Sequence, residues 1–213
     1  MPVLRVMKNG EHLCTVGSDE VWMFSASVWG DVWGPEVSHL DVSGGSKRNP
    51  SGESDFLIWE MPHDLTKLDR LTFFFEEGSA SSPMGSKFDP EAYPPEEQKI
   101  EISFPPTDDD LTKLESRAPL NIEFSWLISI NGVQDIKLSP DVTRQHTSLR
   151  MHWDEERPQH LRISISKKSL REISSRNGGE NIFLGRVPLG STVDITVGCP
   201  GIQEGRAKAR PLI

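Results

Sequence analysis

The stretch "NIEFSWLISINGVQDIKL" (residues 121–138) decides the fold class. Its first half alternates apolar and polar residues. The apolar set is Ile122, Phe124, Trp126, Ile128 and Ile130. Because side chains in a strand point to opposite faces in turn, this period of two predicts a β-strand with one buried and one solvated face. The Asn-Gly pair that follows predicts a hairpin.

The register of this hairpin follows from its two faces. A two-residue loop would place a charged residue opposite Ile128, on the most apolar face of the chain, because a one-residue slip exchanges the faces of a strand. A three-residue loop over residues 130–132 pairs Trp126 with Ile136 instead. We therefore predict a positive φ at Gly132 and burial of the Trp126 face against a second sheet.

A second Asn-Gly pair, at positions 9 and 10, predicts a two-residue turn. This loop pairs Lys8 with Glu11 and Val6 with Leu13, so that charge meets charge and apolar side chain meets apolar side chain. The sequence therefore predicts a hairpin at the start of the chain.

Other segments repeat the strand pattern, and helix is scarce. The strand candidates with clear patterns are residues 56–61, 71–77, 99–104, 161–166 and 192–197. The best helix candidate is the short stretch 167–179. Many short strands of this kind are typical of sandwiches. We predict an all-β fold, an antiparallel β-sandwich of jelly-roll-like type, with at most one or two short helices.

Residues 78–98 separate two strand-rich parts of the chain. The segment is rich in proline, serine and carboxylates and shows no periodicity, which is typical of a long loop or a linker. We predict a single sandwich domain over residues 1–213, with a long acidic loop at 78–98 that is dispensable for folding. The alternative is two small β domains, 1–77 and 99–213.

The pentapeptide "DLTKL" occurs at 64–68 and again at 110–114. In both copies the aspartate is suited to cap a single helical turn, so we predict two similar loops. The leucines of each copy would then close an open end of the sandwich. The copies do not indicate an internal duplication, since the two Asn-Gly pairs have a different offset.

The net charge of −9 is unevenly distributed. Residues 76–110 hold ten acids against two lysines, a net of −8, whereas residues 144–213 hold twelve Lys and Arg against seven acids, a net of +5. This polarity predicts that the two segments interact, within one chain or between chains. Candidate partner-binding residues are Arg150, Arg162, Lys168 and Arg171. The overall acidity makes nucleic acid an unlikely partner.

Three tryptophans lie close together in "DEVWMFSASVWGDVWG" (residues 19–34). Trp22 falls on an apolar stripe, which predicts a place in the core. Trp29 and Trp33 stand beside glycines and are candidates for an exposed platform on which a sugar would stack. A carbohydrate-binding sandwich is therefore one alternative function.

His152 and Asp154 form a His-x-Asp pair on one face of a predicted strand. Metal-dependent oxygenases on jelly rolls use such a pair with a second, distant histidine. Here only His160 follows, close in the sequence, and the alternate residues of the strand are apolar, so the pair is expected to face solvent. A metal-dependent enzyme is the second alternative.

The sequence lacks G-x-S-x-G, H-E-x-x-H, C-x-x-C and phosphate-loop patterns. We therefore predict a soluble, non-enzymatic binding protein, acting through protein partners or self-association, without a cofactor. The start of the chain carries charges and has no apolar core typical of a signal peptide, and nothing resembles a membrane span. These features favour the cytoplasm. Cys14 and Cys199 are left open as a possible pair.

Overall fold

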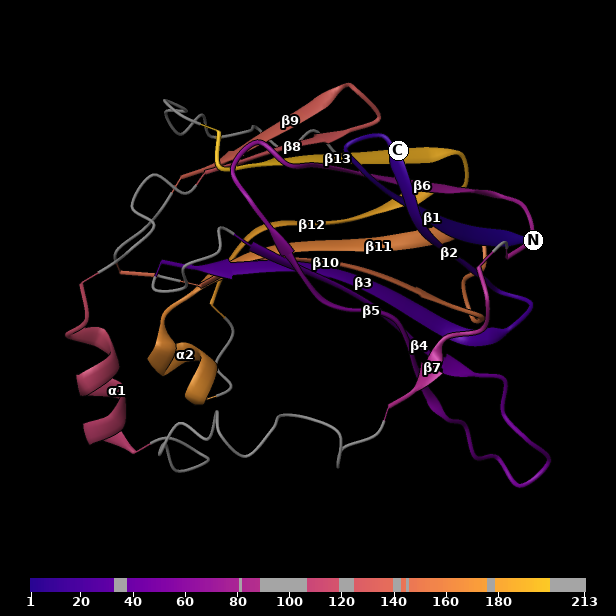
Figure 1. The fold of residues 1–213 in the computed structure, drawn as a ribbon, viewed down its shortest axis with the longest axis horizontal. Helices are drawn as coiled ribbons and strands as arrows, with labels where there is room; N and C mark the ends of the chain where they lie inside the picture. The colour runs from indigo at the N-terminus through magenta and orange to yellow at the C-terminus, as the bar shows by residue number, and fades with distance from the viewer. Residues whose placement is uncertain are drawn as a thin grey trace.

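Two antiparallel β-sheets pack face to face in the computed structural model (Figure 1). The structure describes residues 1–32, 38–80, 82–88, 107–118, 125–139, 143–144, 146–175 and 179–199. Every pair of neighbouring strands among them is antiparallel. The predicted all-β sandwich is therefore confirmed.

The smaller sheet has six strands in the order β2-β1-β6-β13-β8-β9. Their bounds are β1 (Pro2–Lys8), β2 (Glu11–Gly17), β6 (Arg70–Glu77), β8 (Trp126–Ile130), β9 (Gln134–Leu138) and β13 (Ser191–Val197). The larger sheet has seven strands in the order β12-β11-β10-β3-β4-β5-β7. Their bounds are β3 (Val21–Asp31), β4 (Ser38–Ser46), β5 (Phe56–Leu65), β7 (Ser86–Lys87), β10 (His146–Asp154), β11 (His160–Lys168) and β12 (Glu180–Pro188).

Two short helices lie together beside the larger sheet, at the lower left of Figure 1. They are α1 (Asp108–Glu115) and α2 (Leu170–Ser174), and each begins with a capping box, in which a hydroxyl and an acidic side chain bond to each other's backbone N–H. In the part of the chain that the structure describes, neither helix nor any other is long and apolar enough to cross a membrane.

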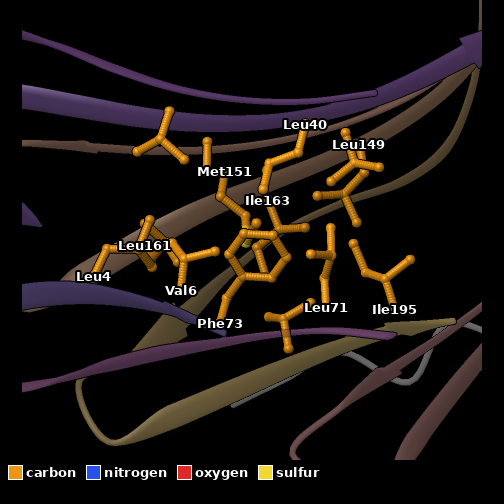
Figure 2. Close-up of a cluster of buried hydrophobic side chains, with 14 of the residues drawn as sticks. Leu4, Val6, Leu40, Leu71, Phe73, Leu149, Met151, Leu161, Ile163 and Ile195 are labelled. Atoms are coloured by element: carbon orange, nitrogen blue, oxygen red, sulfur yellow. The ribbon is translucent and has the colours of Figure 1, made fainter. Parts of the chain in front are cut away.

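The core fills the space between the sheets (Figure 2). Figure 2 shows Leu4, Val6 and Phe73 of the smaller sheet pointing toward Leu149 and Ile163 of the larger one. All five side chains are essentially inaccessible to solvent. The packing follows from the period-two pattern of each strand, which gives each sheet one continuous apolar face.

Buried tryptophans make specific contacts inside this core. The Trp126 indole N–H donates to Ser38 Oγ at 2.9 Å and so joins the two sheets, since Ser38 lies on β4. Trp153 stacks on Phe24 with ring centroids 4.9 Å apart, and its N–H donates to the carbonyl of Pro158. A buried indole needs such an acceptor, so these bonds stabilise one arrangement of the core.

Each sheet combines strands from both sides of residues 78–98. The smaller sheet pairs β6 with β13, and the larger pairs β3 with β10. The single domain and the dispensable loop stay predictions, and this interleaving favours the first. Within the segment, residues 86–87 form β7 at the edge of the larger sheet, and the described residues are exposed or half-buried.

The hairpin of β8 and β9 has the predicted faces but a different register. Gly132 has φ +63° and Trp126 is fully buried, as expected. Trp126 pairs with Leu138, however, where Ile136 was predicted, because the three-residue turn spans Asn131–Val133. Asn131 also has a positive φ of 54°, so two residues of the turn are left-handed. The shift by two positions preserves both faces.

The first hairpin also follows the prediction only near its turn. Lys8 pairs with Glu11, as expected, with Asn9 and Gly10 both at positive φ. A β-bulge between Val6 and Met7 then shifts the register, so that Val6 pairs with Cys14 and the predicted pairing with Leu13 is wrong. The inserted residue buries Cys14 in the core.

Candidate binding face

The seven-stranded sheet has a polar face on the side away from the core. On β3, Phe24, Ala26 and Val28 are buried in the core, so Ser25 and Trp29 point to the opposite side. Strands β4, β10 and β11 alternate in the same way. We call the side of this sheet that faces away from the core the outer face.

Trp29 is the centre of an aromatic cluster on the outer face. Its neighbours across the ladder are His39 on β4 and Ser148 on β10. The His39 ring lies 4.3 Å from the indole, and the ring of His146 lies 6.1 Å away. Asp64 on β5 completes the row, with its Oδ1 at 2.9 Å from His39 Nδ1. Because His39 packs on the indole, less of Trp29 is available for stacking with a sugar.

The environment of His146 favours a neutral imidazole. Burial lowers its pKa below the ordinary value, and the nearby Lys168 lowers it further, while Asp31 partly opposes the shift. Lys168 lies directly across the ladder from His146. The cluster therefore presents an aromatic, weakly charged edge of the outer face.

An arginine-rich patch lies beside this cluster on the outer face. Arg162 on β11 pairs directly with Arg186 on β12, and Arg150 on β10 pairs with Ser164, diagonal to Arg162. All three arginines are exposed. Within the described part of the chain none of them forms an ion pair. We call Arg150, Arg162 and Arg186 the arginine patch.

Titratable neighbours of the arginine patch are shifted by burial. Burial raises the pKa of Asp41 on β4, and Arg150 partly opposes this shift. Burial lowers the pKa of His152, and the positive charges of Arg150 and Arg162 lower it further, while Asp154 opposes the shift. Burial disfavours the charged form of both groups, whereas the three arginines are exposed.

His152 and Asp154 share the outer face, as predicted. His152 Nε2 lies 3.7 Å from Asp154 Oδ2, and the alternate residues Leu149, Met151 and Trp153 are buried. Among the residues whose positions are described, no three His, Cys, Asp or Glu side chains are grouped so that they could hold a metal ion. The pair stays a prediction as a metal site, and the described residues add no third ligand to it.

The predicted partner-binding residues do not all lie together. Arg150, Arg162 and Lys168 are on the outer face, whereas Arg171 is on α2. There Arg171 bonds to Asp108 at 3.0 Å and to Glu115 at 3.1 Å, both on α1. Of these two acids only Asp108 belongs to the acidic segment 76–110, so one ion pair joins the two segments within the chain, and their wider interaction stays a prediction.

A shallow depression borders the arginine patch at the turn between β10 and β11. It is lined by Arg157, Pro158, Gln159, His160 and Arg186. Through Arg186 it is continuous with the arginine patch. The same turn carries exposed Glu155 and Glu156, so the positive charge is concentrated on the outer face and not at this end of the sheet.

The sequence alone placed the tryptophans only in part. Trp29 is half-buried on the outer face, and Trp33 lies outside the described residues. Trp22 is not in the core, which corrects the prediction. A bulge between Val21 and Met23 turns Trp22 to the rim, where its N–H donates to Ser54 and Arg48 stacks 4.5 Å from its ring.

Sequence reasoning missed His39, His146 and Arg186 as site residues. The alternation in "SHLDVS" (38–43) could have placed His39 and Asp41 on one face, since Leu40 and Val42 are buried. Their grouping with Trp29 depends on which strands become neighbours, and no local pattern contains that information.

The two cysteines are both free thiols. Cys14 is buried on β2, and burial raises its pKa to about 12, so it is a poor nucleophile. Cys199 is half-buried, and burial raises its pKa as well. The pairing that the sequence left open does not form.

No family model matches this chain, and no curated protein or solved structure is significantly similar to it.

Proposed function

We propose that this protein is a non-catalytic binding protein, and that a protein partner with an acidic segment binds to the outer face over the arginine patch. The observation that carries the proposal is the pairing of Arg162 with Arg186 on adjacent strands. Like charges directly across a ladder destabilise a sheet. The fold gains nothing from this arrangement, whereas an anionic partner would be held by both side chains.

The geometry suits a carboxylate-rich peptide. Arg150 is diagonal to Arg162, so the three guanidinium groups follow one another across β10, β11 and β12. Each guanidinium can hold a carboxylate through two parallel hydrogen bonds. The serines beside them, such as Ser148 and Ser166, whose hydroxyls lie 3.1 Å apart, are small and leave the face flat.

Fluorescence anisotropy with a labelled oligoglutamate peptide tests this proposal. The double variant Arg150→Glu/Arg162→Glu should bind at least tenfold more weakly than the unmodified protein, and binding should weaken with salt. The matched control is Arg117→Glu/Lys137→Glu, which makes the same charge change at two exposed positions, one just after α1 and one on β9. Equal losses in both variants would show a general charge effect and overturn the proposal.

A glycan array separates the carbohydrate alternative from the proposed function. If the protein binds a glycan and Trp29→Ala abolishes that binding, while Arg150→Glu/Arg162→Glu does not, the outer face is a sugar site and the proposal is wrong. Unchanged peptide binding in Trp29→Ala is the expected result, because the indole lies beside the arginine patch and not within it.

A further inference from the structure

We infer that the acidic segment of the partner binds as an added β-strand, which pairs antiparallel with the free edge of β12. The inference rests on the proposed function and specifies how the partner is held. Strand β12 ends the order of the larger sheet, with β11 as its neighbour. The free edge of a sheet presents backbone N–H and C=O groups to which an extended peptide can bind.

The ladder to β11 shows which backbone groups of β12 are free. Leu189 N donates to Gln159 O at 3.0 Å, which makes these two residues a hydrogen-bonded pair. Bonded and non-bonded pairs alternate in an antiparallel ladder. In the register of β11 and β12, Leu184 and Arg186 belong to the non-bonded pairs, so their N–H and C=O groups point away from β11. Pro188 falls in the same set, as expected for a residue without an N–H.

The usable part of the edge is short. A register shift opposite Ile165 and Ser166 leaves Ile182 outside the ladder and interrupts the alternation there. The free groups are therefore those of Leu184 and Arg186, with the C=O of the proline that follows. Within the described residues no other backbone group bonds to them. They fit a short extended peptide.

The side chains at these positions determine which peptide fits. Leu184 and Arg186 lie on the outer face, because Val187, the next residue along the strand, is buried in the core. Leu184 is 59% exposed, and Arg186 is exposed as well. A complementary strand has an apolar residue opposite Leu184 and an acidic residue opposite Arg186. Because the added strand is antiparallel, the acidic residue comes two positions before the apolar one in the partner.

The arginine patch surrounds this edge with positive charge. Arg162 on β11 lies directly across from Arg186. Ser164 lies between Leu184 and Arg150 in the row that crosses the three strands. A carboxylate of the added strand beside Arg186 therefore offsets the repulsion between Arg186 and Arg162. Further acidic residues of the partner then lie over the rest of the patch, which favours an acidic segment over a basic or neutral one.

The other described edges lack this combination. On β2, Thr15 N already donates to Ser82 Oγ at 2.8 Å. Strand β7 has two residues. The exposed side chains of β9, Asp135 and Lys137, have opposite charges and select neither sign. Among the described strands, β12 is thus the edge that combines free backbone groups, an exposed apolar residue and positive charge.

Fluorescence anisotropy with labelled peptides tests the inference. The probe is Glu-Thr-Glu-Thr-Leu-Thr-Glu, in which the second Glu faces Arg186 and the Leu faces Leu184. N-methylation of that Glu and of the Leu removes two N–H groups that donate to β12, so the Kd should rise about tenfold or more. N-methylation of the two threonines on either side of that Glu is the matched control. Their N–H groups point away from β12, so the Kd should stay nearly unchanged.

Two variants of the protein test the same contact. Leu184→Pro removes an N–H that the ladder to β11 does not use, so the variant should fold and bind the probe about tenfold more weakly. Leu184→Lys keeps the backbone groups and tests the register if the proline variant fails to fold. It should shift the ratio of the two Kd values about tenfold in favour of a probe with Glu in place of the Leu. Val133→Lys adds the same charge at a residue 88% exposed on the β8–β9 turn and should leave this ratio unchanged.

The outcomes separate the inference from the proposed function. Equal losses from the two N-methylations, or the same Kd ratio in Leu184→Lys as in the unmodified protein, would overturn the added strand. If Arg150→Glu/Arg162→Glu still weakens binding in that case, the partner lies on the outer face without extending the sheet, and the proposed function stands alone. If neither the probe nor oligoglutamate binds to the unmodified protein, the proposed function is wrong and the inference is wrong with it.

Discussion

The pentapeptide Asp-Leu-Thr-Lys-Leu has two different structures in this protein. Residues 64–68 form the end of β5 and the turn into β6, whereas residues 110–114 lie inside α1. Because the five residues are identical, the difference must come from the sequence around them and from the surfaces that they meet. The local preference of these five residues therefore does not determine their structure by itself.

The first copy is held in place by the smaller sheet. Asp69, directly after the pentapeptide, accepts from Thr66 N at 2.9 Å and from Asn9 Nδ2 at 2.7 Å, and Lys8 Nζ lies 3.2 Å from it. Leu68 N donates to Val197 O, with Leu68 itself at φ +72°. The contacts with Lys8, Asn9 and Val197 come from distant parts of the chain, and together with the local Thr66 bond they fix a turn.

The second copy is held by local signals. Thr107 accepts from Asp110 N, Asp110 bonds back to the Thr107 N–H, and acidic residues occupy the first turn of α1. Carboxylates at a helix N-terminus are favourable. The predicted pair of similar loops is therefore wrong. The first copy is not helical, and in the second copy Thr107, not Asp110, is the cap.

The largest expected difference concerns the first leucine of each copy. Leu65 is fully buried within the continuous core, whereas Leu111 is 5% exposed and lies outside that core cluster. We expect Leu65→Ala to lower the free energy of unfolding by about 3 kcal/mol and Leu111→Ala by about 1–2 kcal/mol. Urea unfolding measures both. Equal losses would mean that α1 is as tightly integrated as the sheets.

The residue after each copy gives a second contrast. Burial alone would raise the pKa of Asp69, but hydrogen bonds from Asn9, the Thr66 backbone and Lys8 outweigh it and lower the pKa to about 2. A lowered folded pKa stabilises the protein above the unfolded value of about 4, and this contribution is lost as the pH falls toward 2.

We therefore expect Asp69→Asn to cost about 2 kcal/mol at pH 7 and to remove the part of the stability loss that occurs between about pH 4 and pH 2. The matched control is Glu115→Gln, which changes the equivalent residue of the second copy at its ion pair with Arg171. That exposed pair should contribute little to the stability, because solvent screens it. Urea unfolding at pH 3 and pH 7 measures both variants. If Asp69→Asn lowers the free energy of unfolding equally at the two pH values, the lowered pKa of Asp69 is not the source of the effect.

The sequence predicted the faces of strands well and their partners poorly. The buried faces of Trp126 and of Met151 follow from alternation, which depends only on the neighbouring residues. The predicted register of the β8–β9 hairpin was wrong by two positions, because Val133 joins the turn although it is apolar. The candidate site shows the same limit. Trp29, His39 and His146 come from three strands, and only the order of the sheet brings them together.

A smaller effect is expected at the cap of the second copy. Thr107→Ala removes the hydroxyl that accepts from Asp110 N, which should cost α1 about 1 kcal/mol. Because α1 lies beside the sandwich, we expect the loss to appear as faster amide exchange over residues 111–115, with little change in global stability. Thr66→Ala, at the third position of the first copy, should leave the exchange of α1 unchanged. Faster exchange that also extends through the sheets would show that the helix is coupled to the core.

The smallest effect should have opposite signs in the two copies. Leu68, the last residue of the first copy, is 63% exposed and has φ +72°, a left-handed conformation that costs a residue with a Cβ about 1 kcal/mol. Glycine adopts this conformation without that cost, although it gains more freedom on unfolding. Leu68→Gly should therefore raise the free energy of unfolding by about 0.5 kcal/mol. Leu114→Gly, at the same position of the second copy, should lower it by about 1 kcal/mol, because glycine is a poor helix former. Urea unfolding of the two variants compares them directly. If both substitutions destabilise the protein, the backbone of the first copy is not held in the left-handed region, and the contrast between the two copies must come from the side chains alone.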